Sequence, residues 1–118
     1  MIGARTDPLF GPLVVVGLGG ILVELLKDSA LALAPVQHDE ALAMLRGLKG
    51  AALLTGFRGA EPVDLDRLAD IICRASELAA DGCGEIAEMD INPLICAGAS
   101  ITAVDGLIVK HDPGAARA

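Results

Sequence analysis

The sequence has 118 residues, of which 53% are hydrophobic and only 2% aromatic, and its formal net charge is −7. This length suits one domain with a hydrophobic core and is too short to predict two. The acidic balance argues against a nucleic-acid partner, because neutralising phosphates needs clustered Lys and Arg. An acidic protein can still bind a nucleotide through Mg²⁺.

Cysteine usage and hydropathy indicate the expected compartment. Cys73, Cys83 and Cys96 form no CxxC pair and have no His at zinc spacing, so reduced thiols are expected instead of a disulfide framework. No apolar run reaches the roughly 20 residues that span a bilayer, and the first residues lack the pattern of a signal peptide. These features favour a cytoplasmic protein.

The first third of the chain predicts strands. Residues 1–12 are polar and end in a Gly-Pro turn, and the β-branched run 13–16 predicts a buried strand. The glycines of 17–20 then predict a hairpin turn into a second strand over 21–26. Residues 29–34 could form a third strand, which the following proline would end.

Two features of this region have a functional alternative. The glycine segment 17–20 could bring backbone close to a phosphate, although Leu22 takes the place of the third glycine of a GxGxxG pattern. Glu24 has apolar neighbours on both sides, where a charge is costly unless it is paired or faces a site. The alternative is an outward-facing Glu24 on a half-exposed strand.

Helical spacing predicts two helices. The first would be capped by Asp39 and end at Gly50, and the second would begin after Pro62 and Asp64 and end at Gly82. The apolar stripe of the second helix comprises Leu65, Leu68, Ile71, Ile72, Ala75, Leu78 and Ala79. Strands followed by two helices and further strands predict an α+β sandwich, with one sheet and its helices on one face.

Between the helices, Arg58 stands in a short loop with glycine on either side, at 56 and 59. Such an Arg can approach a phosphate as a bidentate donor. The alternative is a solvated loop Arg. His38 precedes the first helix with no second ligand nearby, which predicts a solvated or capping histidine.

A polar and apolar alternation organises residues 85–105. Glu88, Asp90 and Asn92 recur at every second position, and residues spaced in this way share one face of an extended chain. The apolar residues between them would face a core. Pro93 would end this strand, because proline lacks the N–H that pairing needs.

A second strand over 101–105 follows a connection that contains Gly98. A hairpin would therefore bring Asp105 back towards Asn92. Residues 107–109 continue the strand-like pattern, and the polar segment 110–118 is expected to be a flexible tail.

Convergence of Asp90, Asn92 and Asp105 would supply oxygen ligands, which suit Mg²⁺. At roughly 3.3 Å per residue, Asp90 and Asn92 lie about 7 Å apart, whereas Glu88 and Asn92 lie about 13 Å apart. Glu88 is therefore the weaker candidate. The alternative is an edge hairpin whose polar face is only solvated.

Four segments, in order, resemble the ATP-grasp domain of NDP-forming acyl-CoA synthetases and of the related succinyl-CoA synthetase beta subunit. The resemblance covers about residues 7–109 and is specific because its motifs extend over nearly the whole chain. The segments are DPLFGP (7–12), GLGGILVELLKD (17–28), LLTGFRG (53–59) and EMDINPL (88–94) followed by AVD (103–105).

This resemblance implies a single domain, the carboxy-terminal lobe of an ATP-grasp unit. The reaction of the family interconverts acyl-CoA, NDP and phosphate with acid, CoA and NTP. The nucleotide, ATP/ADP or GTP/GDP, would lie between this lobe and a first lobe that the chain lacks. A CoA-binding subunit or domain would also be required, and the chain alone would be incomplete. Self-association into a homo-oligomer is left open.

By the same resemblance, Asn92 and Asp105 would bind Mg²⁺ with Asp90 in a supporting or second-metal role. Arg58 would contact phosphate in catalysis and nucleotide binding, and Glu24 would line the nucleotide cleft. Neither histidine, His38 nor His111, matches a phosphohistidine motif. The alternative function is a non-catalytic interaction or regulatory module, such as the synthetase-like part of a protein acetyltransferase.

Overall fold

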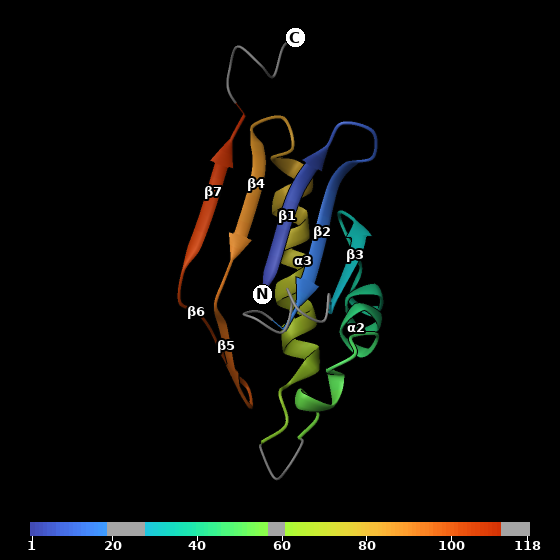
Figure 1. Ribbon diagram of the computed structural model, residues 1–118, viewed down its shortest axis with the longest axis vertical. Coiled ribbons are helices and arrows are strands. Elements are labelled where there is room, and N and C mark those ends of the chain that lie inside the picture. Colours follow the sequence, from blue (N-terminus) through green and yellow to red (C-terminus); the bar gives the residue numbers. More distant parts are fainter. Residues whose placement is uncertain (19–27, 57–60, 112–118) are drawn as a thin grey trace.

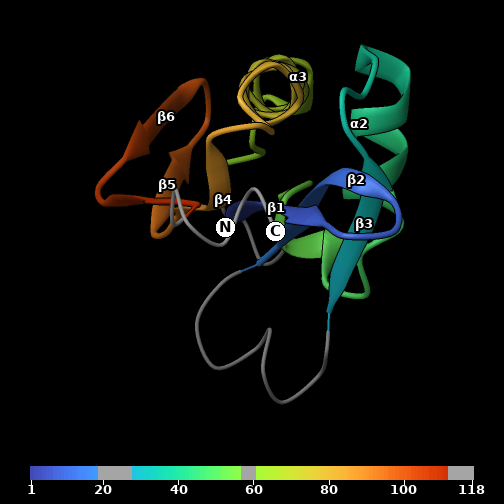
Figure 2. The ribbon, with the colours of Figure 1, turned by 90° about the horizontal axis from the view of Figure 1, so that it is seen from above.

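The computed structural model describes residues 1–18, 28–56 and 61–111 (Figure 1). One layer is a five-stranded sheet in the order β3-β2-β1-β4-β7, and every neighbouring pair is antiparallel. Its strands are β1 (Ile2–Asp7), β2 (Gly11–Gly17), β3 (Ser29–Leu33), β4 (Ile86–Ile91) and β7 (Gly106–Lys110). Helices α2 (His38–Arg46) and α3 (Leu65–Asp81) lie together on one face of the sheet (Figure 2). The predicted α+β architecture is confirmed.

The sequence analysis did not predict the central strand β1, and its description of residues 1–12 as a polar segment was wrong. Ile2 and Ala4 are buried against the helices, whereas Gly3 and Arg5 alternate to the other face, which the helices leave open. Gly3 permits close strand packing, since a Cβ there would lie 3.0 Å from Val15 Cγ1. A strand with apolar side chains on one face only, and with a glycine in it, has little strand signal.

The flanking strands agree with the sequence where the structure describes them. The β-branched run over 13–16 lies in β2, with Val14 and Val16 fully buried. The third strand is β3, and it pairs with β2 from Leu13↔Leu33 to Gly17↔Ser29. The strand expected over 21–26 lies outside the described residues.

The boundaries of α2 differ from those predicted. Its N-cap is Gln37, not Asp39, and the Gln37 backbone N–H donates to Glu40 Oε1 at 3.1 Å. This hydrogen bond, from the N-cap backbone to the side chain of the third helical residue, is half of a capping box. The helix therefore begins two residues earlier than predicted. The helix ends at Gly47, before the predicted Gly50, and the short 3₁₀ helix η1 (Ala51–Leu53) follows.

Helix α3 has the predicted caps. Asp64 accepts a hydrogen bond from the Arg67 backbone N–H at 3.1 Å, and Gly82 is the C-cap. Most of the predicted stripe packs on the core, but Leu78 is 48% exposed and that part of the prediction was wrong. The buried residues of α3 are Leu68, Ala69, Ile72, Ala75, Ser76 and Ala79.

Ser76 is a buried polar residue of α3 that binds the segment just before α2. Its hydroxyl donates to the Cys73 carbonyl at 2.7 Å and accepts from the Val36 N–H at 3.0 Å. Val36 precedes α2, so this contact holds the start of α2 against the middle of α3. Both polar groups are thereby satisfied inside the core.

A long hairpin continues beyond the sheet. The β4–β7 pairing is followed by a two-stranded ladder of β5 (Leu94–Ala97) and β6 (Ser100–Ala103), with Gly98 at the turn in a left-handed conformation, φ 61°. Ile91 pairs with Gly106 and Leu94 with Ala103, so one register runs through both ladders. The hairpin is confirmed, whereas β5 was not predicted. No helix within the described ranges is long and apolar enough to cross a membrane.

Candidate functional site

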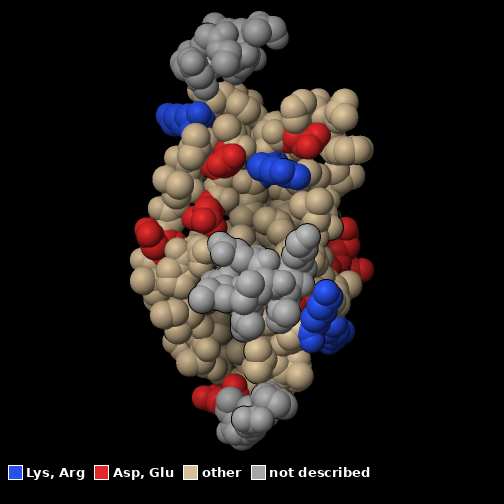
Figure 3. Space-filling view, viewed as in Figure 1, with Lys and Arg blue, Asp and Glu red and all other residues tan. Residues whose placement is uncertain are grey.

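The face of the sheet opposite the helices contains a hollow of about 540 Å³. Its lining comes from all five strands, and Figure 3 shows this face with a few charged side chains among mostly uncharged ones. Glu88 and Asp90 line the hollow, while Met89 between them also packs into the core with 5% exposure. The predicted division of β4 into a polar face and a core face is therefore confirmed.

Asp90 lies on β4, between the central strand β1 and the edge strand β7. It pairs with Gly3 of β1 on one side and with Leu107 of β7 on the other. Its Oδ1 is buried and has no hydrogen-bond partner within the described part of the chain. Burying an unsatisfied carboxylate oxygen is costly, so this oxygen is suited to receive a cation or a donor that enters the hollow.

Asn92 and Asp105 are brought together at the end of the β4–β7 pairing, as predicted. The Asn92 N–H donates to the Asp105 carbonyl at 3.2 Å, and the Val104 N–H donates to the Pro93 carbonyl at 3.0 Å. Both the Asn92 and Asp105 side chains are exposed. Asp105 Oδ1 also accepts from the Gly106 N–H at 2.9 Å, which fixes its carboxylate beside the hairpin.

The predicted ligands Asp90, Asn92 and Asp105 suit a Mg²⁺ ion that also binds water and phosphate better than an ion held by protein ligands alone. Within residues 1–18, 28–56 and 61–111, no three His, Cys, Asp or Glu side chains group closely enough to hold an ion. Mg²⁺ usually takes one or two carboxylates and completes its shell with water and substrate phosphates. Asn92, Asp105 and Asp90 offer side-chain oxygens of the type that Mg²⁺ prefers. Of the three, only Asp90 is among the described residues that line the hollow.

Arg5 is a residue of the hollow that the sequence analysis missed. It is the one Lys or Arg among the described lining residues, and it pairs in register with Glu88 of β4 and Leu13 of β2. Glu88 is exposed and lies two residues further along β4 from Asn92 than Asp90 does. The sequence signal for this placement was weak, because the alternation of Ile2 and Ala4 with Gly3 and Arg5 is short and includes a glycine.

The other two predicted site residues, Arg58 and Glu24, lie outside the described residues. The structure therefore leaves their roles as expectations.

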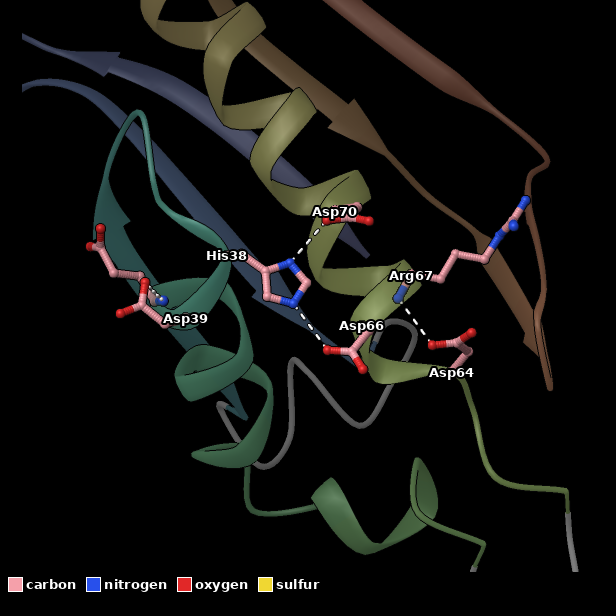
Figure 4. Close-up of polar contacts among 7 residues, drawn as sticks. His38, Asp39, Asp64, Asp66, Arg67 and Asp70 are labelled. Atoms are coloured by element: carbon pink, nitrogen blue, oxygen red, sulfur yellow. Dashed lines mark hydrogen bonds and ion pairs between the residues drawn. The ribbon is translucent and has the colours of Figure 1, made fainter.

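The two histidines lie away from the lining of the hollow. His38, predicted as solvated or capping, lies between two carboxylates of α3, with Nδ1 2.9 Å from Asp70 Oδ1 and Nε2 3.0 Å from Asp66 Oδ1 (Figure 4). The Asp66 contact, followed by that of Asp70, raises the pKa of His38 above its ordinary value. His111 Nε2 lies 3.2 Å from the Cys83 carbonyl.

A family model for the ATP-grasp domain matches residues 1–109. The beta subunit of ADP-forming acetate–CoA ligase I from Pyrococcus furiosus is 45% identical over 109 residues, which are 92% of this chain and 47% of that subunit. ADP-forming 4-hydroxybutyrate–CoA ligase from Nitrosopumilus maritimus is 44% identical over 95 residues, 80% of this chain and 14% of that ligase. The chain thus spans about half of the first relative and a small part of the second.

Solved structures agree with these sequence relatives. A dinucleotide-forming acetyl-coenzyme A synthetase 1 from Ca. Korarchaeum cryptofilum, in complex with coenzyme A and Mg-AMPPCP, matches with a TM-score of 0.88 and 44% identity. The match covers 93% of this chain and 51% of that chain. A Pyrococcus horikoshii protein matches with a TM-score of 0.86 and 37% identity, over 93% of this chain and 47% of that protein. The chain therefore belongs to the ATP-grasp domain family, and its relatives are ADP-forming acyl-CoA synthetases.

Proposed function

We propose that this chain supplies one half of the nucleotide-binding and phosphoryl-transfer site of an NDP-forming acyl-CoA synthetase. The complete enzyme would convert acyl-CoA, NDP and phosphate into acid, CoA and NTP, in either direction. The sequence relatives carry out ligations of this class by name, and the chain covers only part of each. The other half of the nucleotide site would come from polypeptide outside this chain.

One observation carries the proposal: the buried Oδ1 of Asp90 has no hydrogen-bond partner among the described residues, and Asp90 lines a hollow of about 540 Å³. A hollow of this size is within the usual range for small-molecule sites. A buried carboxylate oxygen without a hydrogen bond is costly, so a cation or hydrogen-bond donor bound at this position would stabilise the protein.

Asn92 and Asp105 would hold Mg²⁺ bound to the nucleotide, and Asp90 would support it or hold a second ion. When bound, Mg²⁺ would neutralise charge on the phosphate oxygens and fix their orientation. The chain's own contribution is rigidity, because strand pairing positions Asp90, and the Asn92 N–H contact positions the Asp105 backbone.

Cationic groups would complete the phosphate contacts. Arg58 is assigned this role from its glycine-flanked loop, and its planar fork suits bidentate phosphate binding. Arg5 is added as a second candidate, because it lies on the lining of the hollow across from Glu88. Glu24 is retained as a lower-ranked contact to the nucleotide.

Two partners complete this function. The first ATP-grasp lobe would close over the open sheet face, and a CoA-binding part would deliver the acyl group. The Pyrococcus furiosus relative is called a subunit beta, whereas this domain is about a seventh of the Nitrosopumilus maritimus ligase. We therefore place the CoA-binding part on a separate subunit or on another domain of one polypeptide.

The test uses the complete synthetase that contains this chain. We expect Asp90→Asn to weaken Mg²⁺-dependent nucleotide binding by about tenfold or more in calorimetry, because the variant loses the negative charge on the lining of the hollow. Asp81→Asn, at the exposed end of α3, is the matched control and should bind nucleotide as the wild type does. Equal binding by wild type and Asp90→Asn would contradict the proposal, as would a wild-type protein that binds no nucleotide.

A further inference from the structure

The β5–β6 hairpin extends beyond the end of the sheet, and its tip is bonded to the start of α3 (Figure 1). The Asp64 backbone N–H donates to the Gly98 carbonyl at 3.0 Å. The carboxylate of Glu61 also lies over the same turn, because a Cβ added at Gly98 would be 2.5 Å from Glu61 Oε1. The tip is therefore held by a segment that belongs to neither strand of the hairpin.

The segment that holds the tip is itself fixed to the body of the domain. Asp64 is the N-cap of α3 and accepts from the Arg67 N–H at 3.1 Å (Figure 4). The preceding residue, Val63, donates its N–H to the Leu54 carbonyl at 2.8 Å, directly after η1. The bond from Asp64 to Gly98 thus ties the hairpin to the first turn of a packed helix.

The opposite end of the same hairpin carries two of the proposed Mg²⁺ ligands. Asn92 lies two residues before β5, and Asp105 lies two residues after β6. A two-stranded hairpin is only marginally stable by itself, and one face of this one packs against the core through Leu94, Cys96 and Ile101. A hairpin that is also fixed at its tip tilts less about its base, so the ligands at the base keep their place.

We propose that the bond between the Asp64 N–H and the Gly98 carbonyl is a positioning contact for the Mg²⁺ site, and that it sets the placement of Asn92 and Asp105 through the hairpin. This inference rests on the proposed function. Asp64 and Gly98 are not among the described residues that line the hollow, so they act through the hairpin. Such contacts matter because the side chains of a binding site must be held within roughly 0.5 Å of their working geometry.

A proline at position 64 removes this bond selectively. Asp64 has a φ of −70°, close to the value that proline fixes, and proline has no N–H to donate. Asp64→Ala is the matched control, because it loses the same side-chain cap on Arg67 but keeps the backbone N–H. Both variants are made in the complete synthetase, and the difference between them reports the bond to Gly98.

Hydrogen exchange without metal tests whether the bond holds the hairpin. We expect the amides of residues 94–103 to exchange about threefold to tenfold faster in Asp64→Pro than in Asp64→Ala, the factor that one backbone hydrogen bond contributes. The amides of β1 should exchange equally in the two variants, which shows that the sheet is intact. Equal exchange of the hairpin in both variants would overturn the proposal.

Calorimetry then separates positioning from a purely structural role. We expect Asp64→Pro to bind a non-hydrolysable ATP analogue with Mg²⁺ about threefold to tenfold more weakly than Asp64→Ala, and to bind the analogue without Mg²⁺ equally. A contact that only stabilises the fold leaves the affinity of the folded protein unchanged. Equal affinities with Mg²⁺, or an equal loss with and without Mg²⁺, would overturn the proposal even if the hairpin exchanges faster.

The reciprocal effect is measured on the wild type and needs no variant. If fixing the tip favours Mg²⁺ binding, then binding must strengthen the bond at the tip by the same factor. We expect the Asp64 amide to exchange at least about threefold slower when Mg²⁺ and the ATP analogue are bound. The Arg67 amide, which donates to the Asp64 side chain, is the control and should not change. An unchanged Asp64 amide would overturn the proposal.

Failure of this inference differs from failure of the proposed function. If the wild-type synthetase binds Mg–nucleotide but Asp64→Pro and Asp64→Ala bind it equally, only the positioning role is wrong. If the wild type binds no nucleotide, the proposed function is wrong and the positioning inference falls with it.

Discussion

The backbone N–H of Asn92 donates to the carbonyl of Asp105 at 3.2 Å, at the junction between the two ladders of the long hairpin. On one side of this contact β4 pairs with β7, and on the other side β5 pairs with β6. The two residues thus become neighbours through strand pairing, with no metal needed to join them. Their side chains remain exposed, where a ligand can reach them.

Asp105→Asn should lower turnover of the complete synthetase by orders of magnitude and leave the metal-free fold nearly unchanged. The variant keeps an oxygen that can accept the Gly106 N–H, now bonded to Asp105 Oδ1 at 2.9 Å, but loses the negative charge. We expect the free energy of unfolding to change within roughly ±0.5 kcal/mol, as at surface sites, whereas loss of a metal ligand slows phosphoryl transfer.

Steady-state turnover at saturating Mg²⁺ and thermal unfolding without metal are measured on the same Asp105→Asn preparation. Asp81→Asn is the control for both. Turnover equal to the wild type would remove Asp105 from the site, and a large loss of metal-free stability would make it a structural residue.

The 118-residue chain alone should show no acyl-CoA synthetase turnover and should bind Mg–ATP only weakly. The chain spans about half of the Pyrococcus furiosus subunit, so about half of the nucleotide contacts proposed for the complete site would be absent. Calorimetry and a coupled turnover assay on the purified chain test this. Saturable turnover, or nucleotide binding at micromolar affinity or tighter, would contradict the prediction.

Asp28→Ala should destabilise the fold although it lies away from the hollow lining. Asp28 is 3% exposed, and its carboxylate accepts from the Lys49 N–H at 2.6 Å and the Gly50 N–H at 2.8 Å. Removing the carboxylate deletes two partly buried hydrogen bonds, each of which contributes about 0.5–1.5 kcal/mol.

Urea unfolding of Asp28→Ala measures this loss. Asp28→Asn, which keeps one acceptor oxygen, should lie between Asp28→Ala and the wild type. Asp81→Ala, which removes an exposed carboxylate, should change the free energy of unfolding little. Equal stability of Asp28→Ala and the wild type would show that water replaces the carboxylate.

His38 should make stability depend on pH. Both ring nitrogens contact carboxylates, so the protonated ring, which donates from both, fits this geometry best. The pKa of His38 is raised from its ordinary 6.5, chiefly by Asp66 and then by Asp70. The contribution of His38 is therefore fully present below about pH 6.5 and is lost as the pH rises through the higher pKa of the folded state.

Urea unfolding at a series of pH values, for wild type and His38→Gln, measures this contribution. We expect the wild-type advantage over His38→Gln to shrink as the pH rises. NMR titration of the ring gives the folded-state pKa independently. An advantage that is constant with pH, together with an ordinary pKa, would contradict the prediction.

Local patterns in the sequence were enough to predict α3 and the β4 hairpin. Asp64 and Gly82 mark the two ends of α3, as predicted, because capping depends on residues within one turn of the helix end. The alternation of Glu88, Met89 and Asp90 predicted the two faces of β4, because a strand repeats every second residue. The family resemblance followed from short motifs of the same local kind.

The tertiary structure alone decided the centre of the sheet and the environment of His38. Residues 2–7 became the middle strand because β2 and β4 pair with both of their edges, which no local pattern in a short, glycine-containing segment reveals. His38 meets Asp66 and Asp70 only because α2 packs beside α3. Oδ1 of Asp90 is buried, with no hydrogen-bond partner in the described part of the chain, because β1 and β7 flank β4 on both sides. These contacts depend on long-range packing, whereas periodicity and capping act over a few residues.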